Sequence, residues 1–331
     1  MAIIACNKHS VPKLQLFEKA QLLPRAWSHT PATQHHFFNP AITCFREQLI
    51  MCYRVVTPAG ERRLALCRLT PDFQVVPASA VPFSDFIQDG GDWHADGRFC
   101  TFQDRLFLHY NDGGQRGRRA NQIYLVEVDP DQLVPLGPPR ALMVDGARQP
   151  VEKNWMLFAH GDELWAIYSI APHVVLKVTL AGDGSIRCRR IYEHQWDVTA
   201  YTQRYGQLRG GAPPVRWGDH YISFFHSRFL ARPLRYRLSR LLSKVPTNIV
   251  HYVGGVYGFA AEPPFTPLWL LPEPILLPPH LPRRQQQLNP EVEYSAYPCG
   301  AILQDQHWII SFGARDEYCC LSQFDAARMI P

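Results

Sequence analysis

Short hydrophobic runs rich in aromatic and β-branched residues recur along the chain, each at a similar distance after a short motif. The motifs begin at residues 39, 96, 152, 211 and 298, and the runs occupy residues 49–53, 106–110, 164–168, 221–225 and 308–312. Successive motifs are therefore 57, 56, 59 and 86 residues apart. Helical periodicity is nearly absent, so the runs are typical of buried strands.

A second strand-like segment follows each run, at residues 63–69, 122–128, 173–180, 248–259 and 317–324. A repeat of this length with about four strands has the size of one propeller blade. We therefore predict an all-β, five-bladed β-propeller that uses residues 1–331 as a single domain. The alternative is a β-sandwich in which the spacing is a coincidence.

The long interval between the fourth and fifth motifs contains a basic segment. Residues 228–244 carry six basic side chains and no acidic one, and leucines recur there at helical spacing. This pattern predicts an inserted amphipathic basic helix at about residues 228–246, helical over 229–245 and outside the ring. Between Arg228 and Lys244 it could contact an anionic membrane surface or a lipid-linked or phosphorylated glycan. The alternative is a helix packed on the rim with its basic face in water.

Composition and charge narrow the functional classes. The 331 residues carry 34 basic and 29 acidic side chains, a net charge of +5, and 46% are hydrophobic. This favours a globular chain and argues against a general nucleic-acid binder. Charged residues within residues 1–23, such as Lys13 and Glu18, argue against a signal peptide.

The cysteines and histidines point to no metal or cofactor. None of the nine cysteines forms a Cys-x-x-Cys pair, and the 14 histidines lack metal-ligand spacing. We expect reduced thiols, a cytoplasmic location and no bound cofactor or metal. Peripheral contact with a membrane, through the basic segment, is the alternative for location.

Equivalent positions of propeller repeats converge on one axis, and here many of them are polar. The positions that open each repeat, or directly follow its aromatic run, are Asn39, Asp96, Lys153, Gly211 and Pro298, and Arg54, Asn111, Ser169, His226 and Gly313. Such residues do not suit strands buried on both faces. They predict a polar pocket at the axis.

The motifs resemble those of glycoside hydrolase family 130, five-bladed propellers that are phosphorylases and hydrolases of β-mannosides, and related mannosyltransferase/phosphorylase enzymes. The matching segments run from about residue 39 to 324: Asn39-Pro40-Ala41 with Tyr53-Arg54, Asp96-x-Arg98, Lys153 before Leu157-Phe158, His226 after Phe224-Phe225, and Gly313-Ala314-Arg315-Asp316. The order and spacing of these segments carry the resemblance.

The resemblance implies roles for several residues. Asp96 falls on the family's general acid, Lys153 and His226 on positions that hold phosphate, and Asp316 on a carboxylate that contacts the sugar. The family's Glu-Asp-Pro-Arg is Ala95-Asp96-Gly97-Arg98 here. The phosphate-binding arginines have no clear match, although Arg116, Arg118 and Arg119 lie in that stretch.

The chemistry of these side chains fits glycosidic cleavage. Asp96 could protonate the leaving oxygen if its pKa is raised, whereas direct contact with Arg98 would lower that pKa. Phosphate can attack the anomeric carbon without a protein base, but water would need a second carboxylate, for which Asp316 and Glu152 are candidates.

We expect two groups of binding residues besides Asp96. Those expected to contact the sugar are Asn39, Arg54, Arg98, Asp316, Trp93 and His173. Those expected to bind phosphate are Lys153, His226 and Arg209. Each also has a plain structural interpretation: an Asp96–Arg98 pair that fixes a loop, a surface lysine, a core histidine, a turn aspartate, or a packed tryptophan.

The resulting hypothesis is an inverting phosphorylase of β-mannosides or similar glycosides. Its partners would be an oligosaccharide and inorganic phosphate or a glycosyl phosphate, with no nucleic acid. One alternative is a glycosyltransferase that uses a nucleotide-sugar such as GDP-mannose on the same fold. Another is a glycan-binding propeller without activity.

Overall fold

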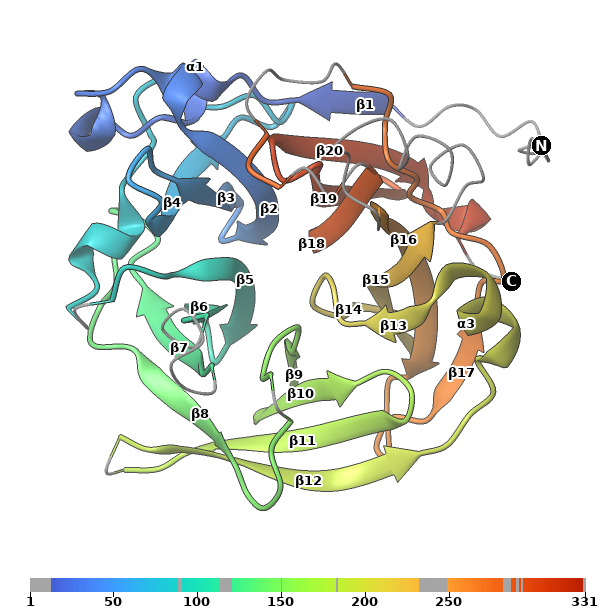
Figure 1. The fold of residues 1–331 in the computed structure, drawn as a ribbon. Coiled ribbons are helices and arrows are strands. Elements are labelled where there is room, and N and C mark those ends of the chain that lie inside the picture. The colour runs from blue at the N-terminus through green and yellow to red at the C-terminus, as the bar shows by residue number, and fades with distance from the viewer. Residues whose placement is uncertain are drawn as a thin grey trace.

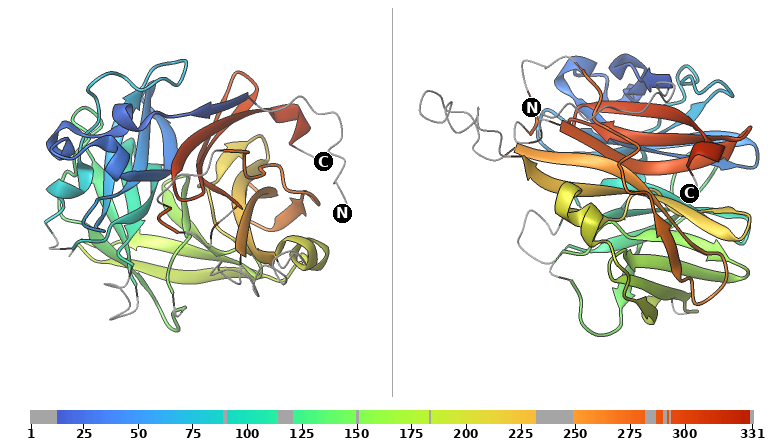
Figure 2. Two further views of the ribbon diagram at one scale, coloured as in Figure 1. Left: turned by 45° about the horizontal axis from the view of Figure 1, so that its top comes forward. Right: turned by 90° about the vertical axis from the view of Figure 1, so that its right-hand side faces the viewer.

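The strands of the molecule form antiparallel sets that follow one another around a central opening (Figure 1). The computed structural model describes residues 13–88, 91–113, 121–149, 151–182, 184–231, 249–281, 287–289, 292 and 294–329. Many strands lie roughly along the axis of the ring in the side view of Figure 2, whereas β11 (His173–Leu180) and β12 (Ile186–His194) at the rim lie across it in Figure 1. The structure is mostly β and propeller-like, which agrees with the predicted fold class.

The sets follow the chain order. The first contains β2 (His36–Phe45), β3 (Gln48–Val56) and β4 (Arg62–Leu69). The second contains β5 (Ala95–Phe102), β6 (Arg105–Asn111), β7 (Ile123–Val128) and β8 (Arg140–Val144). The third contains β9 (Met156–His160), β10 (Glu163–Ser169), β11 (His173–Leu180) and β12 (Ile186–His194).

The last two sets complete the ring. One contains β13 (Gln207–Arg209), β14 (Val215–Trp217), β15 (His220–Ala231), β16 (Ile249–Ala260) and β17 (Pro267–Leu270). The other contains β18 (Tyr294–Gln304), β19 (His307–Ala314) and β20 (Tyr318–Asp325), together with β1 (Lys13–Leu16) from the start of the described chain. Parallel pairings of β8 with β12 and of β16 with β18 link neighbouring sets into larger sheets.

The core explains why the aromatic runs are strands. Each run lies in a second strand of its set, β3, β6, β10, β15 or β19, where both faces are covered by neighbouring sets. Between the first two sets, for example, Ile50 and Leu64 pack in one cluster with Phe99 and Leu108. Burying apolar side chains on both faces stabilises each sheet, so alternation with polar residues is not needed.

Helices are short and lie outside the sheets. Among the described residues they are α1 (Lys19–Leu22), α3 (Thr199–Tyr205) and the 3₁₀ turns η1 (Arg25–Trp27), η2 (Ala32–Gln34), η3 (Phe83–Phe86) and η4 (Ala326–Arg328). Among the residues that the structure describes, no helix has the length and apolar character needed to cross a membrane.

The predicted inserted helix is wrong at its start. Residues 228–231 belong to β15, which pairs with β16 over its whole length, from His220 opposite Ala260 to Ala231 opposite Ile249. These residues are strand because their backbone groups pair with β16 in a long hairpin, although the spacing of the leucines predicted a helix. Residues 232–246 of the predicted insertion lie outside the described residues.

A pocket of about 380 Å³ marks the axis of the ring. Its lining includes Ile42 of β2, Thr101 of β5, Ala159 of β9, Pro213 and Ala301 of β18, so all sets contribute. Asn39 and Asp96 lie nearer the start of β2 and β5 than Ile42 and Thr101. The polar positions identified in the sequence therefore lie toward the other end of these inner strands.

Candidate active site

Asn39 and Asp96 occupy bulges in the two inner strands β2 and β5. The strand register shifts between Phe38 and Ala41, and again between Ala95 and Arg98. Both residues have a positive φ, 52° for Asn39 and 55° for Asp96, a conformation that Asn and Asp tolerate better than most residues. A bulge redirects a side chain, and here Asn39 Nδ2 donates to Asp96 Oδ1 at 2.9 Å.

Positively charged groups surround the Asp96 carboxylate. Arg54 Nη1 lies 3.3 Å from Asp96 Oδ1, and Asn111 Nδ2 lies 3.5 Å from Oδ2. Burial acts to raise the pKa of Asp96, but the charge of Arg54, the Asn39 hydrogen bond and the charges of Arg98 and Lys153 outweigh it. The pKa of Asp96 is therefore below its ordinary value, and the free protein holds a carboxylate here.

A close approach from β19 fixes Asn39 in this position. A Cβ atom on Gly313 would lie 2.0 Å from Asn39 Oδ1 and 2.7 Å from the Asn39 backbone nitrogen. Only glycine leaves room for this contact. Gly313, the residue that follows the fifth aromatic run, therefore allows close packing of β19 against Asn39.

Arg98 is buried, with 1% of its surface exposed, and its guanidinium is committed to protein groups. Nη1 donates to the carbonyl of Trp155 at 3.0 Å, and Nη2 donates to the Gly210 carbonyl at 3.3 Å and to the Tyr297 hydroxyl at 3.2 Å. These contacts join β5 to three other parts of the ring. Arg98 therefore positions the inner strands, and the structure does not support the predicted direct contact with the sugar.

Asp316 lies close enough to Arg54 and Asp96 for their charges to act on it. It sits in the turn between β19 and β20 with φ of 53°. Burial raises the pKa of Asp316, and the negative charge of Asp96 adds to this, while Arg54 opposes it. The charge of Arg54 thus acts on two carboxylates with opposite pKa shifts, a pattern typical of acid–base sites.

The basic side of the site comes from β13 and β15 and from the segment before β9. Arg209 of β13 stands opposite His226 of β15 in the strand register, and Gln207 stands opposite Arg228. Side chains two residues apart on a strand share a face, so His226 and Arg228 point the same way. The charges of Arg209 and Arg228 both act on Lys153.

Lys153 and His226 differ in their state of charge. Lys153 is exposed to solvent. Partial desolvation by the surrounding protein nevertheless lowers its pKa, and the charges of Arg209 and Arg228 lower it further. His226 is buried, with its ring 4.2 Å from that of Tyr297 between centroids. Burial and the charges of Arg98, Arg209 and Lys153 hold the pKa of His226 well below its ordinary value. A neutral His226 can offer a hydrogen bond to an anion but no positive charge.

Trp93 reaches the edge of the site. The Arg54 guanidinium lies 6.0 Å from the centre of the Trp93 ring, but Arg62 lies closer, at 3.8 Å. Arg62 therefore stacks on the ring in the way that a sugar would. Trp93 is near the predicted site, with part of its surface already occupied.

His173 lies away from the other predicted residues. Its ring is fully buried beside Tyr257 and Phe259, with centroids 5.8 and 5.2 Å away. Burial lowers its pKa to about 3. The prediction that His173 contacts the sugar is not supported, because its buried ring packs against Tyr257 and Phe259 of a hydrophobic cluster.

Three residues of the site escaped the sequence analysis. Arg228 was assigned to the insertion. If the strand of the fourth aromatic run had been extended by a few residues, Arg228 would have lain on the same face as His226. Tyr297 donates to Asn154 Oδ1 at 2.6 Å, and Asn154 repeats the positive φ of Asn39 and Asp96. The candidate arginines Arg116, Arg118 and Arg119 lie outside the described residues.

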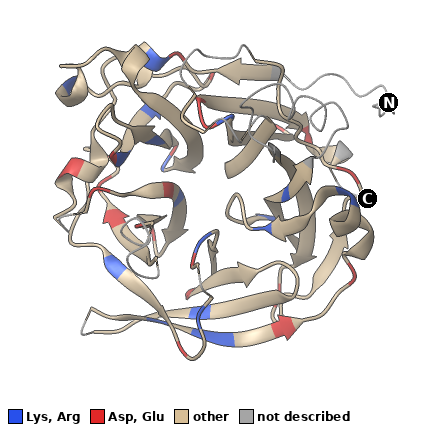
Figure 3. Ribbon diagram, in the orientation of Figure 1, with Lys and Arg blue, Asp and Glu red and all other residues tan. Residues whose placement is uncertain are grey.

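The charges of the site do not cancel. Five described cations, Arg54, Arg98, Lys153, Arg209 and Arg228, act on this cluster. Two carboxylates, Asp96 and Asp316, face them. Glu317 also acts on Asp316, but it is paired with His36 at 2.7 Å. In Figure 3, both blue and red ribbon segments lie around the axis of the ring.

The excess of positive charge in the cluster suits an anion. The described residues contain no group of three or more His, Cys, Asp or Glu side chains placed to hold a metal ion. An anion that enters the cluster would instead meet guanidinium and ammonium donors, which form the stronger charge-assisted hydrogen bonds.

Comparison with known proteins bears on the fold. No protein-family model matches the chain, and no curated protein matches it. A β-1,2-mannobiose phosphorylase from Listeria innocua, in complex with β-1,2-mannobiose, superposes with a TM-score of 0.57 at 13% identity, covering 96% of this chain and 98% of that one. A mannose phosphorylase from Leishmania mexicana, in complex with phosphate, has a TM-score of 0.55 at 12% identity, covering 94% and 89%.

A third structure comes from glycoside hydrolase family 130, a family of mannoside phosphorylases that also contains glycoside hydrolases that target β-1,2-mannosidic linkages. It superposes with a TM-score of 0.56 at 13% identity and covers 97% of this chain and 96% of that one. At these identities the likeness concerns the fold. In its fold, this chain resembles the mannoside phosphorylases of glycoside hydrolase family 130, as its sequence motifs predicted.

Proposed function

We propose that this protein is a carbohydrate-active enzyme that cleaves a β-mannoside, or a similar glycoside, with inorganic phosphate. The observation that carries the proposal is the excess of cations over carboxylates in one cluster that also contains Asp96 and Asp316. A sugar alone would not need this excess positive charge. A phosphate dianion, attacking a sugar held by the carboxylates, would use both halves of the site.

The reaction assigns a role to each half. A phosphate oxygen, held by Lys153, Arg209 and Arg228, attacks the anomeric carbon from the side opposite the leaving group. The new carbon–oxygen bond to phosphate forms as the glycosidic bond breaks, with inversion. The leaving oxygen takes a proton from Asp96, directly or through a sugar hydroxyl, and the products are a glycosyl phosphate and a shortened sugar.

Asp96 must first gain the proton that it donates. In the free protein the surrounding cations keep its pKa low. Bound phosphate would neutralise part of that positive charge, and bound sugar would displace water, and both changes raise the pKa of a carboxyl group. We therefore expect the acid form of Asp96 to be populated only in the ternary complex.

The proposal extends to the architecture and to the cofactor requirement. We take the strand sets as five blades of one propeller domain over residues 1–331, since the site draws on residues from Asn39 to Asp316. No cofactor is required, because phosphate is a substrate. The nucleotide-sugar alternative is favoured by the spread of cations from Lys153 to Arg228, which could also accommodate a diphosphate.

A synthesis assay separates the candidates. The protein is incubated with mannose 1-phosphate, and separately with GDP-mannose, in the presence of a panel of sugar acceptors. Phosphate release from the first mixture supports the phosphorylase, and GDP release from the second supports the glycosyltransferase. Release in neither mixture supports the glycan-binding alternative and contradicts the proposal.

Lys153→Ala tests the phosphate half of the site. We expect the KM for the phosphate-bearing substrate to rise by about tenfold or more, because one charge-assisted contact is lost. The KM for the sugar acceptor should change far less. Lys177→Ala is the matched control, since Lys177 lies on β11, away from the cluster, in a partly exposed pair with Glu163. An unchanged KM in Lys153→Ala would remove Lys153 from the phosphate site.

A further inference from the structure

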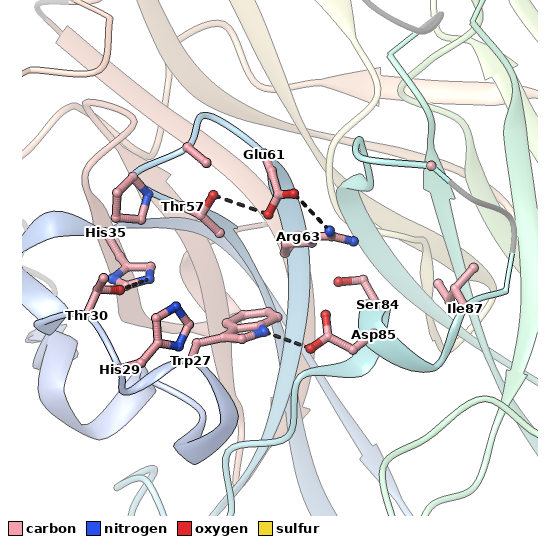
Figure 4. A pocket seen from close by; sticks show the side chains of 13 residues that line it. Trp27, His29, Thr30, His35, Thr57, Glu61, Arg63, Ser84, Asp85 and Ile87 are labelled. Atoms are coloured by element: carbon pink, nitrogen blue, oxygen red, sulfur yellow. Dashed lines mark hydrogen bonds and ion pairs between the residues drawn. The ribbon is translucent and has the colours of Figure 1, made fainter.

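A pocket of about 660 Å³ lies on the outer side of the β3–β4 hairpin, apart from the axis (Figure 4). The segment around η1 and η2 forms one wall, the β3–β4 loop with the start of β4 (residues 57–63) forms a second, and η3 forms a third. The volume falls within the range of about 300–1,000 Å³ that is usual for small-molecule sites.

The lining combines acceptors, donors and an apolar floor. Asp85 and Glu61 supply carboxylate oxygens, and Arg63, Thr57 and Thr30 supply donors. Trp27, Ile87 and Ala59 supply the apolar surface. Sugars present alternating hydroxyl and C–H groups, so their recognition needs both kinds of surface in one cavity.

Hydrogen bonds fix these groups before any ligand arrives. Trp27 Nε1 donates to Asp85 Oδ2 at 2.8 Å, which joins the first and third walls. Arg63 Nη2 lies 3.2 Å from Glu61 Oε1, within the hairpin wall. The hydroxyl of Thr30 and Nε2 of the buried His35 are 3.4 Å apart. A preorganised site loses less entropy when its ligand binds.

The hairpin separates this pocket from the axial site. Glu61 and Arg63 line the pocket, whereas Arg62 between them stacks on Trp93, whose ring is also near Arg54. Alternate residues of a strand point to opposite faces, so one short segment serves both sites. The pocket is therefore a second site and not an extension of the axial cluster.

We propose that this pocket binds a saccharide of one or two rings. Its two carboxylates and one guanidinium give no excess positive charge, which distinguishes it from the phosphate-binding cluster. Its many polar groups make it a poor site for a purely apolar ligand. The choice of mannosides among the first probes rests on the proposed function, but the pocket's own chemistry requires only a neutral sugar.

Calorimetric titration of the whole protein tests this site. The probes are mannose, glucose, galactose, N-acetylglucosamine, β-1,2-mannobiose and β-1,4-mannobiose, each without phosphate. The double variant Asp85→Asn with Glu61→Gln keeps an acceptor for Trp27 but removes both charges. We expect it to weaken binding of the preferred sugar at least about tenfold. Ala59→Trp, which fills the pocket from the exposed hairpin loop, should abolish that binding.

Asp162→Asn is the control, because Asp162 is an exposed carboxylate in the β9–β10 turn. It should bind sugar as the unchanged protein does. Absence of binding with every probe would overturn the proposal. Binding that persists in both pocket variants would place the sugar elsewhere and also overturn it.

The same measurements separate this proposal from the proposed function. Neither pocket variant changes a residue of the axial cluster, so both should retain the phosphorylase reaction at saturating substrate. If the protein shows no phosphorolysis but the pocket variants still lose sugar binding, the pocket proposal stands and the proposed function fails. If phosphorolysis is observed and the pocket variants bind sugar normally, the proposed function stands and the pocket proposal fails.

Discussion

Two amides, Asn39 at 2.9 Å and Asn111 at 3.5 Å, and the guanidinium of Arg54 at 3.3 Å hold the Asp96 carboxylate. Its removal should affect chemistry more than folding. In Asp96→Asn the side chain keeps an oxygen for Asn39 but cannot donate a proton to a leaving group. We expect phosphorolysis to fall by about a hundredfold or more. The melting temperature should fall by a few degrees at most, because Asn keeps the contact with Asn39 but loses the charge attraction to Arg54. Retained activity would contradict the acid role.

Asp316 carries the opposite pKa shift, which makes its effect on stability depend on pH. Burial raises its pKa, so the ionised form is disfavoured in the folded state relative to the unfolded state. This cost is absent below the ordinary pKa of an aspartate and is fully present above the raised value. Asp316→Asn should therefore raise the melting temperature near pH 7, by on the order of 2 °C.

The gain from Asp316→Asn should shrink as the pH falls toward 4, because the native carboxyl is then also neutral. Thermal melts of both proteins at pH 4, 5, 6 and 7 measure the difference. Equal melting temperatures at all four values would show that Asp316 is not held in a strained ionised state. Activity of the variant gives an independent test of the predicted sugar contact.

Among the elements, β19 and β2 meet where Gly313 faces Asn39. Gly313→Ala places a methyl group 2.0 Å from Asn39 Oδ1, so one of the two strands must move. We expect a fall in melting temperature of several degrees, as is usual for overpacking of about 1–3 kcal/mol, together with loss of activity. Activity should fall because Asn39 can no longer hold Asp96.

Gly182→Ala is the matched control for this substitution, because an added Cβ there meets nothing within 4 Å. It should leave activity unchanged and alter the melting temperature little. Loss of activity in Gly182→Ala would mean that the assay reports general damage. Full activity in Gly313→Ala would show that Asn39 does not position Asp96.

Strands that are buried on both faces could be predicted from their apolar sequence. Strand residues that are strand only because a neighbouring strand pairs with them could not. The aromatic runs at residues 49–53 and 308–312 are strands because both faces of β3 and β19 are covered, and any such run needs apolar residues throughout. The basic segment from Arg228 has no such signature. Its first residues are strand because β16 offers a partner for each of them, which only the folded structure reveals.

Single side chains followed the same division. Asn39, Arg54 and Asp96 were predictable as a group because equivalent repeat positions converge on the axis, whereas Asp316 was expected from the family resemblance. His173 and Arg98 were not distinguishable from ligand-binding residues by type alone. Their burial among Tyr257 and Phe259, and among the carbonyls of Trp155 and Gly210, depends on contacts with distant parts of the chain.

Across the whole molecule, the cysteines report how tightly the ring is packed. Of the eight described cysteines, all free, Cys44 on β2 is exposed and the other seven are buried. Burial raises the pKa of Cys100 to about 12, which makes its thiolate scarce. A thiol reagent at neutral pH should therefore modify Cys44 rapidly and the buried thiols only after unfolding.

Cys44→Ser provides the control for this labelling. It should lower the rapid phase by one equivalent without changing the slow phase, which follows the rate of unfolding. The thiols counted in denaturant should reach nine in the original protein, the number in the sequence, if none forms a disulfide. Rapid reaction of the seven buried thiols would contradict the packing described here.

The pairing of β1 with β20 has a consequence for how the chain is made. Lys13 stands opposite Gln323 and Leu16 opposite Cys320, so β1 pairs with a strand that is synthesised much later than itself. While the chain grows from its N-terminus, residues 13–16 must wait for nearly the whole sequence before they can pair. A nascent chain stalled before residue 318 should leave this segment open to protease, and release of the complete chain should protect it.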